Sequence, residues 1–84
     1  MAKRPANGSG YFPKCDEYVR RAGLKNTQVA QAAELHEQSI RRARAGKATS
    51  TETTIRRIVN ALNSLYYDKH PPRIDFDSEY KAHS

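Results

Sequence analysis

The segment from residue 34 to residue 47, ELHEQSIRRARAGK, holds the side chains with the clearest potential for recognition chemistry. Its apolar spacing predicts a helix over residues 37–45, which Gly46 ends. At about 100° per residue, Ile40 and Ala43 fall on one side of this helix and are predicted to face the core. The opposite side carries one amide, two guanidinium groups and one small side chain, namely Gln38, Arg41, Arg42 and Ala45.

This outward face matches the hydrogen-bonding groups on the edges of DNA bases. A glutamine amide can form two hydrogen bonds with adenine, and an arginine guanidinium can form two with O6 and N7 of guanine. An α-helix also fits the major groove of B-form DNA. We therefore predict that Gln38 and Arg42 read bases. The alternative is a solvated basic face, which surface helices often have.

The sequence contains no recognisable catalytic or metal-binding motif. Its three histidines have no cysteine or carboxylate at metal-site spacing, and the single cysteine, Cys15, can form neither an internal disulfide nor a zinc site. No GxSxG, P-loop or paired-carboxylate signature occurs. We predict that the protein is not an enzyme and that it uses no cofactor, metal or small-molecule substrate.

The charge of the chain points to an anionic partner. The formal net charge is +6, and residues 1–62 carry 12 Lys/Arg against 5 Asp/Glu, whereas residues 63–84 carry 3 against 4. Nucleic acid is the first candidate partner for such a basic body. No apolar run approaches the roughly 18 residues of a membrane span, and the N-terminus lacks the apolar segment of a signal peptide. We expect a cytoplasmic protein with no membrane partner.

Four helices are predicted between residues 11 and 67. The first two are marked by apolar residues at helical spacing: Cys15, Tyr18, Val19 and Ala22, then Val29, Ala30 and Ala33. Gly23 is predicted to end the first, and Asn26 or Thr27 to cap the second. The fourth has the strongest periodicity, in Ile55, Ile58, Val59, Leu62 and Leu65. Thr49 followed by Glu52 is a capping-box signature for its start.

The flanks differ from this predicted domain. Residues 1–10 are basic and polar, which is typical of a flexible arm. Residues 68–84 are predicted to be an extended tail, in which residues 73–77, RIDFD, alternate as a strand does. This strand is a candidate for homodimerisation by pairing with its twin, with an interface formed by Ile74, Phe76, Tyr66 and Tyr67. The alternatives are a tail packed on its own core or a disordered tail.

The run NTQVAQAAELHEQSIRRARAGK, followed by STETTIRRIVNALN, resembles the lambda-repressor/Cro-like (XRE) family of helix-turn-helix domains over roughly residues 15–65. Ala30 stands where the family has a small residue between its two helices, and Ile40 where it has a buried aliphatic. The stretches Gln38-Ser39-Ile40 and Gly46-Lys47 also follow the family pattern. The resemblance implies an all-α, compact domain of four to five helices, here over residues 11–67.

The resemblance also implies roles for individual residues. Base contacts would come from the start of the third helix, at His36, Glu37, Gln38 and Arg42. Phosphate contacts would come from Asn26, Lys47 and Thr49, with Ser39 and Arg41 as neighbours. The chain departs from the family at Glu34, where a glycine with positive φ is usual, and at Ala43, where a larger aliphatic is usual. A non-glycine residue in the turn costs about 1–2 kcal/mol, or the turn has another shape.

The expected function is sequence-specific binding of double-stranded DNA by a transcriptional regulator. The resemblance implies a homodimer that binds a palindromic operator, often as an autorepressor of a phage, plasmid or other mobile element. The alternative is a protein-interaction module of the same fold, of the antitoxin or adaptor type, whose tail DFDSEY holds a partner. RNA binding ranks last, because exposed aromatic residues are not interleaved with the basic ones.

Overall fold

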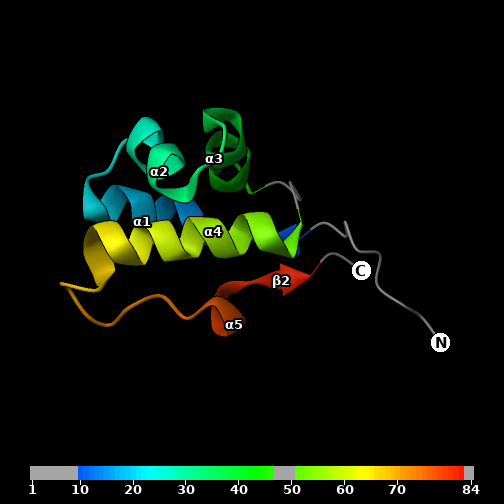
Figure 1. Ribbon diagram of the computed structural model, residues 1–84. Coiled ribbons are helices and arrows are strands. Elements are labelled where there is room, and N and C mark those ends of the chain that lie inside the picture. Colours follow the sequence, from blue (N-terminus) through cyan, green and yellow to red (C-terminus); the bar gives the residue numbers. More distant parts are fainter. Residues whose placement is uncertain (1–9, 47–50, 83–84) are drawn as a thin grey trace.

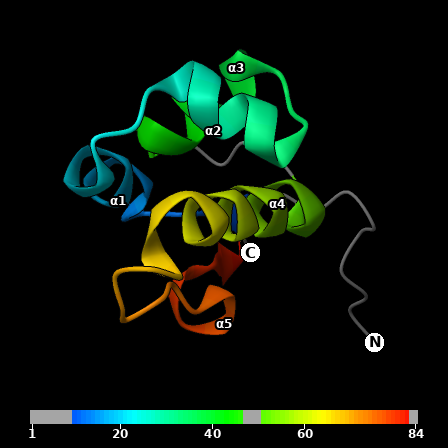
Figure 2. The same cartoon turned by 60° about the vertical axis from the view of Figure 1, so that its left-hand side comes forward.

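Most of the chain is helical, and the helices form three tiers. The computed structural model describes residues 10–46 and 51–82. Within them lie β1 (Gly10–Tyr11), α1 (Cys15–Ala22), α2 (Asn26–Ala33), α3 (Glu37–Arg44), α4 (Glu52–Leu62), the π-helical turn η1 (Asn63–Tyr67), α5 (Phe76–Glu79) and β2 (Lys81–Ala82). α2 and α3 lie on one side of α4, and the C-terminal segment with α5 and β2 lies on the other (Figures 1 and 2). The predicted compact, mostly helical fold is confirmed.

A single apolar cluster joins the tiers. Val19 of α1, Ile40 of α3 and Leu62 of α4 have no exposed surface. The apolar positions predicted for the four helices supply most of the cluster, because each helix turns one apolar stripe inward. Burying such a side chain contributes about 1.5–3 kcal/mol relative to leaving it in water, so this cluster holds α3 firmly on the body.

Two predicted helix stops are confirmed. Gly23 follows α1 with φ 69°, and Leu24 N–H closes the end by donating to Val19 O at 3.1 Å. Gly46 follows α3 with φ 77°. Glycine has no Cβ to clash at positive φ, so it ends helices in this left-handed conformation at little cost.

The predicted N-caps of α2 and α4 are wrong. The cap position of α2 is Lys25, whose backbone N–H donates to the side-chain Oε1 of Gln28 at 2.8 Å. The cap of α4 is Thr51, whose Oγ1 accepts a hydrogen bond from Thr54 N at 3.3 Å. Glu52 is therefore the first helical residue of α4 rather than the reciprocal partner of a cap at Thr49. Thr49 itself lies outside the described residues.

Leu65 was predicted to complete the buried stripe of α4, but its exposed fraction is 38%. The reason is the π-helical turn η1, which begins at Asn63. A π-turn closes over one residue more than an α-turn, so the register of the faces slips. Leu65 is turned outward as a result, and Tyr67 is turned inward to an exposed fraction of 3%.

The predicted strand over residues 73–77 is also wrong. Ile74 enters the core as a single buried residue, and α5 begins two residues later. Asp75 precedes this helical turn and organises it, since its carboxylate accepts from Ser78 Oγ at 2.7 Å and its carbonyl from Ser78 N at 3.1 Å. Alternation of polar and apolar residues did not distinguish a strand from one buried anchor followed by a helical turn.

The C-terminal segment is packed on its own domain, which was one of the alternatives for it. β2 pairs with β1 in antiparallel fashion within the chain, with Gly10 opposite Ala82. Tyr18 Oη of α1 donates to the Glu79 carboxylate at 3.1 Å. The segment predicted as a separate tail, residues 68–84, is thus part of the folded unit as far as residue 82.

Candidate nucleic-acid interface

The turn between α2 and α3 contains a residue in the left-handed conformation, which glycine adopts most easily. Glu34 occupies it with φ 59° and ψ 46°. Leu35 N–H donates to Ala30 O at 2.9 Å across the turn. Of the two possibilities raised by Glu34, a strained residue or a different turn, the structure shows the first. The glutamate itself has positive φ and bears the strain.

His36 starts α3 as its N-cap. Its Nδ1 accepts a hydrogen bond from Gln38 N at 3.1 Å, which leaves the proton of the neutral ring on Nε2. A cap at this position satisfies one of the free N–H groups at the start of a helix. The ring is exposed at the end of α3 where base contacts were predicted.

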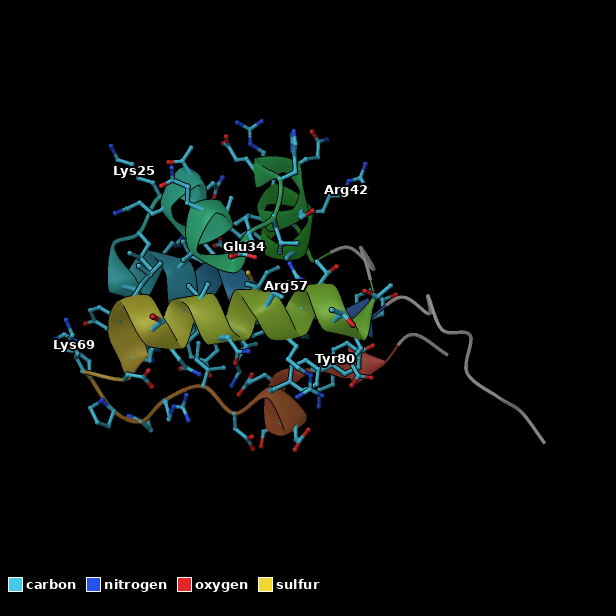
Figure 3. All side chains as sticks on the ribbon, in the orientation of Figure 1. Lys25, Glu34, Arg42, Arg57, Lys69 and Tyr80 are labelled. Carbon is cyan, nitrogen blue, oxygen red and sulfur yellow. The ribbon has the colours of Figure 1, made fainter. Side chains whose placement is uncertain are left out.

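The predicted division of α3 into an inner and an outer face is confirmed. Ile40 is fully buried and Ala43 is 3% exposed, whereas Gln38 and Arg42 are exposed. Figure 3 shows Arg42 projecting away from the rest of the molecule. The outer side chains of α3 therefore point into open solvent, on the side of the molecule opposite the C-terminal segment.

The three arginines of α3 have different surroundings. Arg41 pairs with Glu37 one turn earlier, at 2.9 Å. Arg44 is turned inward and donates to Asp16 of α1 at 2.8 Å and to Asn26 of α2 at 2.7 Å.

Arg42 forms no ion pair with the described part of the chain. Within residues 10–46 and 51–82 its guanidinium is therefore not engaged in an ion pair, whereas that of Arg44 joins α3 to α1 and α2.

The residues predicted to contact phosphate are only partly brought together. Asn26 opens α2 with its Oδ1 occupied by Arg44, so its Nδ2 remains as a donor. Ser39 is half-buried on the flank of α3. Lys47 and Thr49 lie outside the described residues.

Sequence reasoning did not single out Lys25, which is exposed next to the start of α2 and has no ion pair among residues 10–46 and 51–82 (Figure 3). Its place directly before the first residue of α2 was the available signal.

The residues predicted for a dimer interface have other surroundings. Ile74 and Tyr67 are buried in the core of their own chain, and Tyr67 Oη donates to Tyr18 O at 2.6 Å. Phe76 is half-buried beneath the guanidinium of Arg56, 4.1 Å from its ring centroid. Ile74 and Tyr67 are buried, so they cannot form a dimer interface. The segment predicted as an interface strand is instead held in the core of its own chain by Ile74. Tyr66 is half-buried.

The perturbed ionisable groups lie away from the outer face of α3. Burial raises the pKa of the Cys15 thiol to about 12 and that of Tyr18 to about 12, with the hydrogen bond to Glu79 as a further cause for Tyr18. Burial also raises the pKa of Tyr67. Within the described ranges, no three His, Cys, Asp or Glu side chains converge as metal ligands, and no helix is long and apolar enough to cross a membrane.

A scan against protein-family models gave no match, and searches of curated proteins and of solved structures gave none either.

Proposed function

We propose that this protein is a sequence-specific regulator of transcription that binds double-stranded DNA through the outer face of α3, in the manner of lambda-repressor-like domains. The observation that carries the proposal is the state of Arg42, an exposed guanidinium with no ion pair among residues 10–46 and 51–82, one helical turn from the exposed amide of Gln38. Both are held on a helix whose other side is buried. This pair of side chains suits guanine and adenine edges in the major groove.

The neighbours of this pair have supporting roles in the proposal. Arg41 shares its charge with Glu37, so it suits a phosphate contact better than a base contact. Lys25 and the free amide N–H groups of Asn26 approach the same strand backbone from the start of α2. His36 holds the first turn of α3 in place through its cap. The Arg44 contacts to α1 and α2 set the angle at which α3 enters the groove.

Selection from random duplex DNA, followed by fluorescence anisotropy on the enriched site, tests the proposal. Arg42→Ala is compared with Arg20→Ala, which removes the same charge from α1. Gln38→Ala is compared with Gln31→Ala, which changes another exposed glutamine, in α2. Each α3 variant should lose about 1–3 kcal/mol of discrimination between the enriched site and a scrambled one, about 5- to 150-fold.

Lys25→Ala should weaken binding to both the enriched and the scrambled DNA alike. Affinity should also fall steeply with salt, because each phosphate contact releases counterions. If Arg42→Ala keeps the discrimination of the wild type while Arg20→Ala behaves the same, α3 is not the reading helix. If no sequence is enriched at low salt, the proposal is wrong.

A homodimer on a two-fold operator remains part of the proposal, with reading helices about 34–36 Å apart. The mass of the protein on the enriched site, measured by sedimentation, decides between one and two copies. The alternative of an interaction module that holds a partner through residues 75–80 receives no support from a specific observation. Those residues are engaged with their own chain, as Tyr80 stacks on Phe76 at 4.9 Å.

A further inference from the structure

A small cavity lies at the end of the molecule remote from α3, near Lys69 in Figure 3. Its volume is about 270 Å³. Three segments meet there, namely the C-terminal half of α1, the turn η1 and the loop that follows it. Six of its lining residues have ring side chains, namely Tyr18, Tyr66, Tyr67, His70, Pro71 and Pro72. The other two are Arg21 and Arg73.

The aromatic walls are held in place by contacts with one another. His70 stacks on Tyr66 with ring centroids 4.1 Å apart and planes within 10°, and Tyr67 meets Tyr66 edge-on at 4.9 Å. The hydroxyl protons of Tyr18 and Tyr67 are already donated, to Glu79 and to Tyr18 O. Two of the three tyrosines that line the cavity therefore present preformed ring surface rather than a hydroxyl donor, and apolar and aromatic walls are common in small-molecule pockets.

The two arginines determine which charge a molecule bound in this cavity would carry. Aromatic cages often take cations, but here the carboxylates of Glu17 and Asp68 do not line the cavity, whereas the guanidinium groups of Arg21 and Arg73 do. Arg21 pairs with Glu17 at 2.6 Å and Arg73 with Asp68 at 2.8 Å. The four side chains are 48–66% exposed, and ion pairs of this kind contribute only about 0–1 kcal/mol. Each guanidinium has five donors, so it can bind a second anion while keeping or exchanging its carboxylate.

We infer that this cavity binds a small molecule made of one planar aromatic ring and one carboxylate or phosphate group. The ring packs against Tyr66 and the neighbouring prolines, and the anionic group lies between Arg21 and Arg73. The volume is near the lower limit of known ligand pockets, about 300–1,000 Å³, which restricts the ligand to a single ring. The inference does not depend on DNA binding, because the cavity lies on a different part of the molecule.

Bound ligand would connect segments that are far apart in the sequence. Arg21 belongs to α1, Tyr66 to η1, and Arg73 directly precedes the buried anchor Ile74. A ligand that contacts all three should therefore slow the release of the C-terminal segment and raise the thermal midpoint, since it binds the folded state alone.

Nuclear magnetic resonance titration of the full chain with simple probes tests this site. Phenyl phosphate and benzoate carry both required features. Inorganic phosphate and acetate lack the ring, benzyl alcohol lacks the charge, and benzylammonium has the opposite charge. We expect the first two to bind with a dissociation constant on the order of 1 mM, as their size allows. Shifts should be confined to the residues that line the cavity, and the other four probes should bind at least about fivefold more weakly.

Arg21→Gln and Arg73→Gln should each weaken the binding of phenyl phosphate at least about fivefold. Arg20→Gln is the matched control, because it also breaks an exposed ion pair of α1, with Asp16 at 3.0 Å, but does not line the cavity. The inference is overturned if neither aromatic anion binds, if the neutral or cationic ring binds as well, or if both cavity variants bind like Arg20→Gln. Unchanged circular dichroism of the variants confirms that they fold.

Discussion

The side-chain amide of Asn63 is hydrogen-bonded to both backbone polar groups of Ile74. Ile74 N–H donates to Oδ1 at 2.8 Å, and Nδ2 donates to Ile74 O at 3.0 Å. Asn63 is 2% exposed, and it is the polar residue that is buried among the apolar side chains of the described core. The amide supplies the pairing that a neighbouring strand would give, so the chain can enter the core at Ile74 without leaving a buried peptide unsatisfied.

Asn63→Ala should therefore be strongly destabilising. It leaves the buried N–H and C=O of Ile74 without partners, at about 1–3 kcal/mol for each unsatisfied group. We expect the free energy of unfolding in urea to fall by about 2–4 kcal/mol. Asn60→Ala, an exposed asparagine of α4, should stay within about 0.5 kcal/mol of the wild type. Equal effects of the two substitutions would show that the Asn63–Ile74 contact contributes nothing.

Glu34→Gly should stabilise the protein by about 1 kcal/mol. A side chain at φ 59° is strained by about 1–2 kcal/mol, and glycine removes this cost while adding some entropy to the unfolded chain. Glu34→Ala is the control, because it removes the charge but keeps the Cβ. Thermal unfolding should show a higher midpoint for the glycine variant alone. A gain in the alanine variant would assign the effect to charge instead of backbone conformation.

Substitution of Arg44 should lower the stability of the fold, whereas substitution of Arg42 should lower DNA discrimination. Arg44→Gln breaks the contacts to Asp16 and Asn26 and should cost about 1–2 kcal/mol of stability. Arg42→Gln, which breaks no ion pair with the described residues, should leave stability within about 0.5 kcal/mol while it reduces DNA discrimination. Chemical denaturation and DNA anisotropy on both variants provide the comparison. A stability loss in Arg42→Gln would contradict the assignment of that side chain to the free outer face.

Cys15 should be unreactive in the folded protein at neutral pH. Burial raises the pKa of its thiol from 9.0 to about 12, and the thiolate is the reactive form. Ellman's reagent should modify it at the rate of unfolding, and immediately in denaturant. Fast modification of the folded chain would contradict the buried position.

The same shift makes stability depend on pH. Below pH 9.0 the thiol is protonated in both states, and there is no effect. Above it the unfolded chain loses the proton while the folded chain keeps it up to about pH 12, so stability falls as pH rises through this window. Tyr18 adds to the loss above its ordinary pKa of 10.0. Cys15→Ala should remove the part that begins near pH 9.0, and an unchanged profile would show that the thiol does not titrate with folding.

Gly10 and Tyr80 should be strongly coupled. The ring of Tyr80 occupies the space where a Cβ on residue 10 would lie. Gly10→Ala should displace the ring and loosen the pairing of β1 with β2, at about 1–3 kcal/mol. In the Tyr80→Ala background the same change should cost much less, and a double-mutant cycle measures the difference. Additive effects would contradict the close approach.

Several features of the fold follow from local rules and were predicted from the sequence. Gly23 and Gly46 stop helices because glycine adopts positive φ at little cost. The inward position of Ile40 and the outward position of Arg42 follow from the helical repeat of 3.6 residues. Glu34 could also be recognised as unusual, because the family that this stretch resembles usually has a glycine at that position of the turn.

Other features were decided by contacts between distant segments. The role of Arg44 depends on Asp16 and Asn26, which lie 28 and 18 residues away in the sequence. The helical repeat left Arg44 on the flank of α3, off the outer face that holds Arg41 and Arg42, but only the packing of α3 on α1 and α2 gave it its partners. The π-turn at Asn63, which turns Leu65 outward, likewise has no signal in hydrophobic periodicity.

By itself, the sequence determined where helices begin and end within a few residues, which face of each is apolar, and that α3 carries a glutamine and an arginine outward. These are properties of consecutive residues, governed by local geometry and solvation. Only the tertiary structure decided that the C-terminal segment returns to its own core at Ile74. That choice depends on the amide of Asn63, eleven residues earlier, and no local pattern encodes which distant surface a buried residue will find.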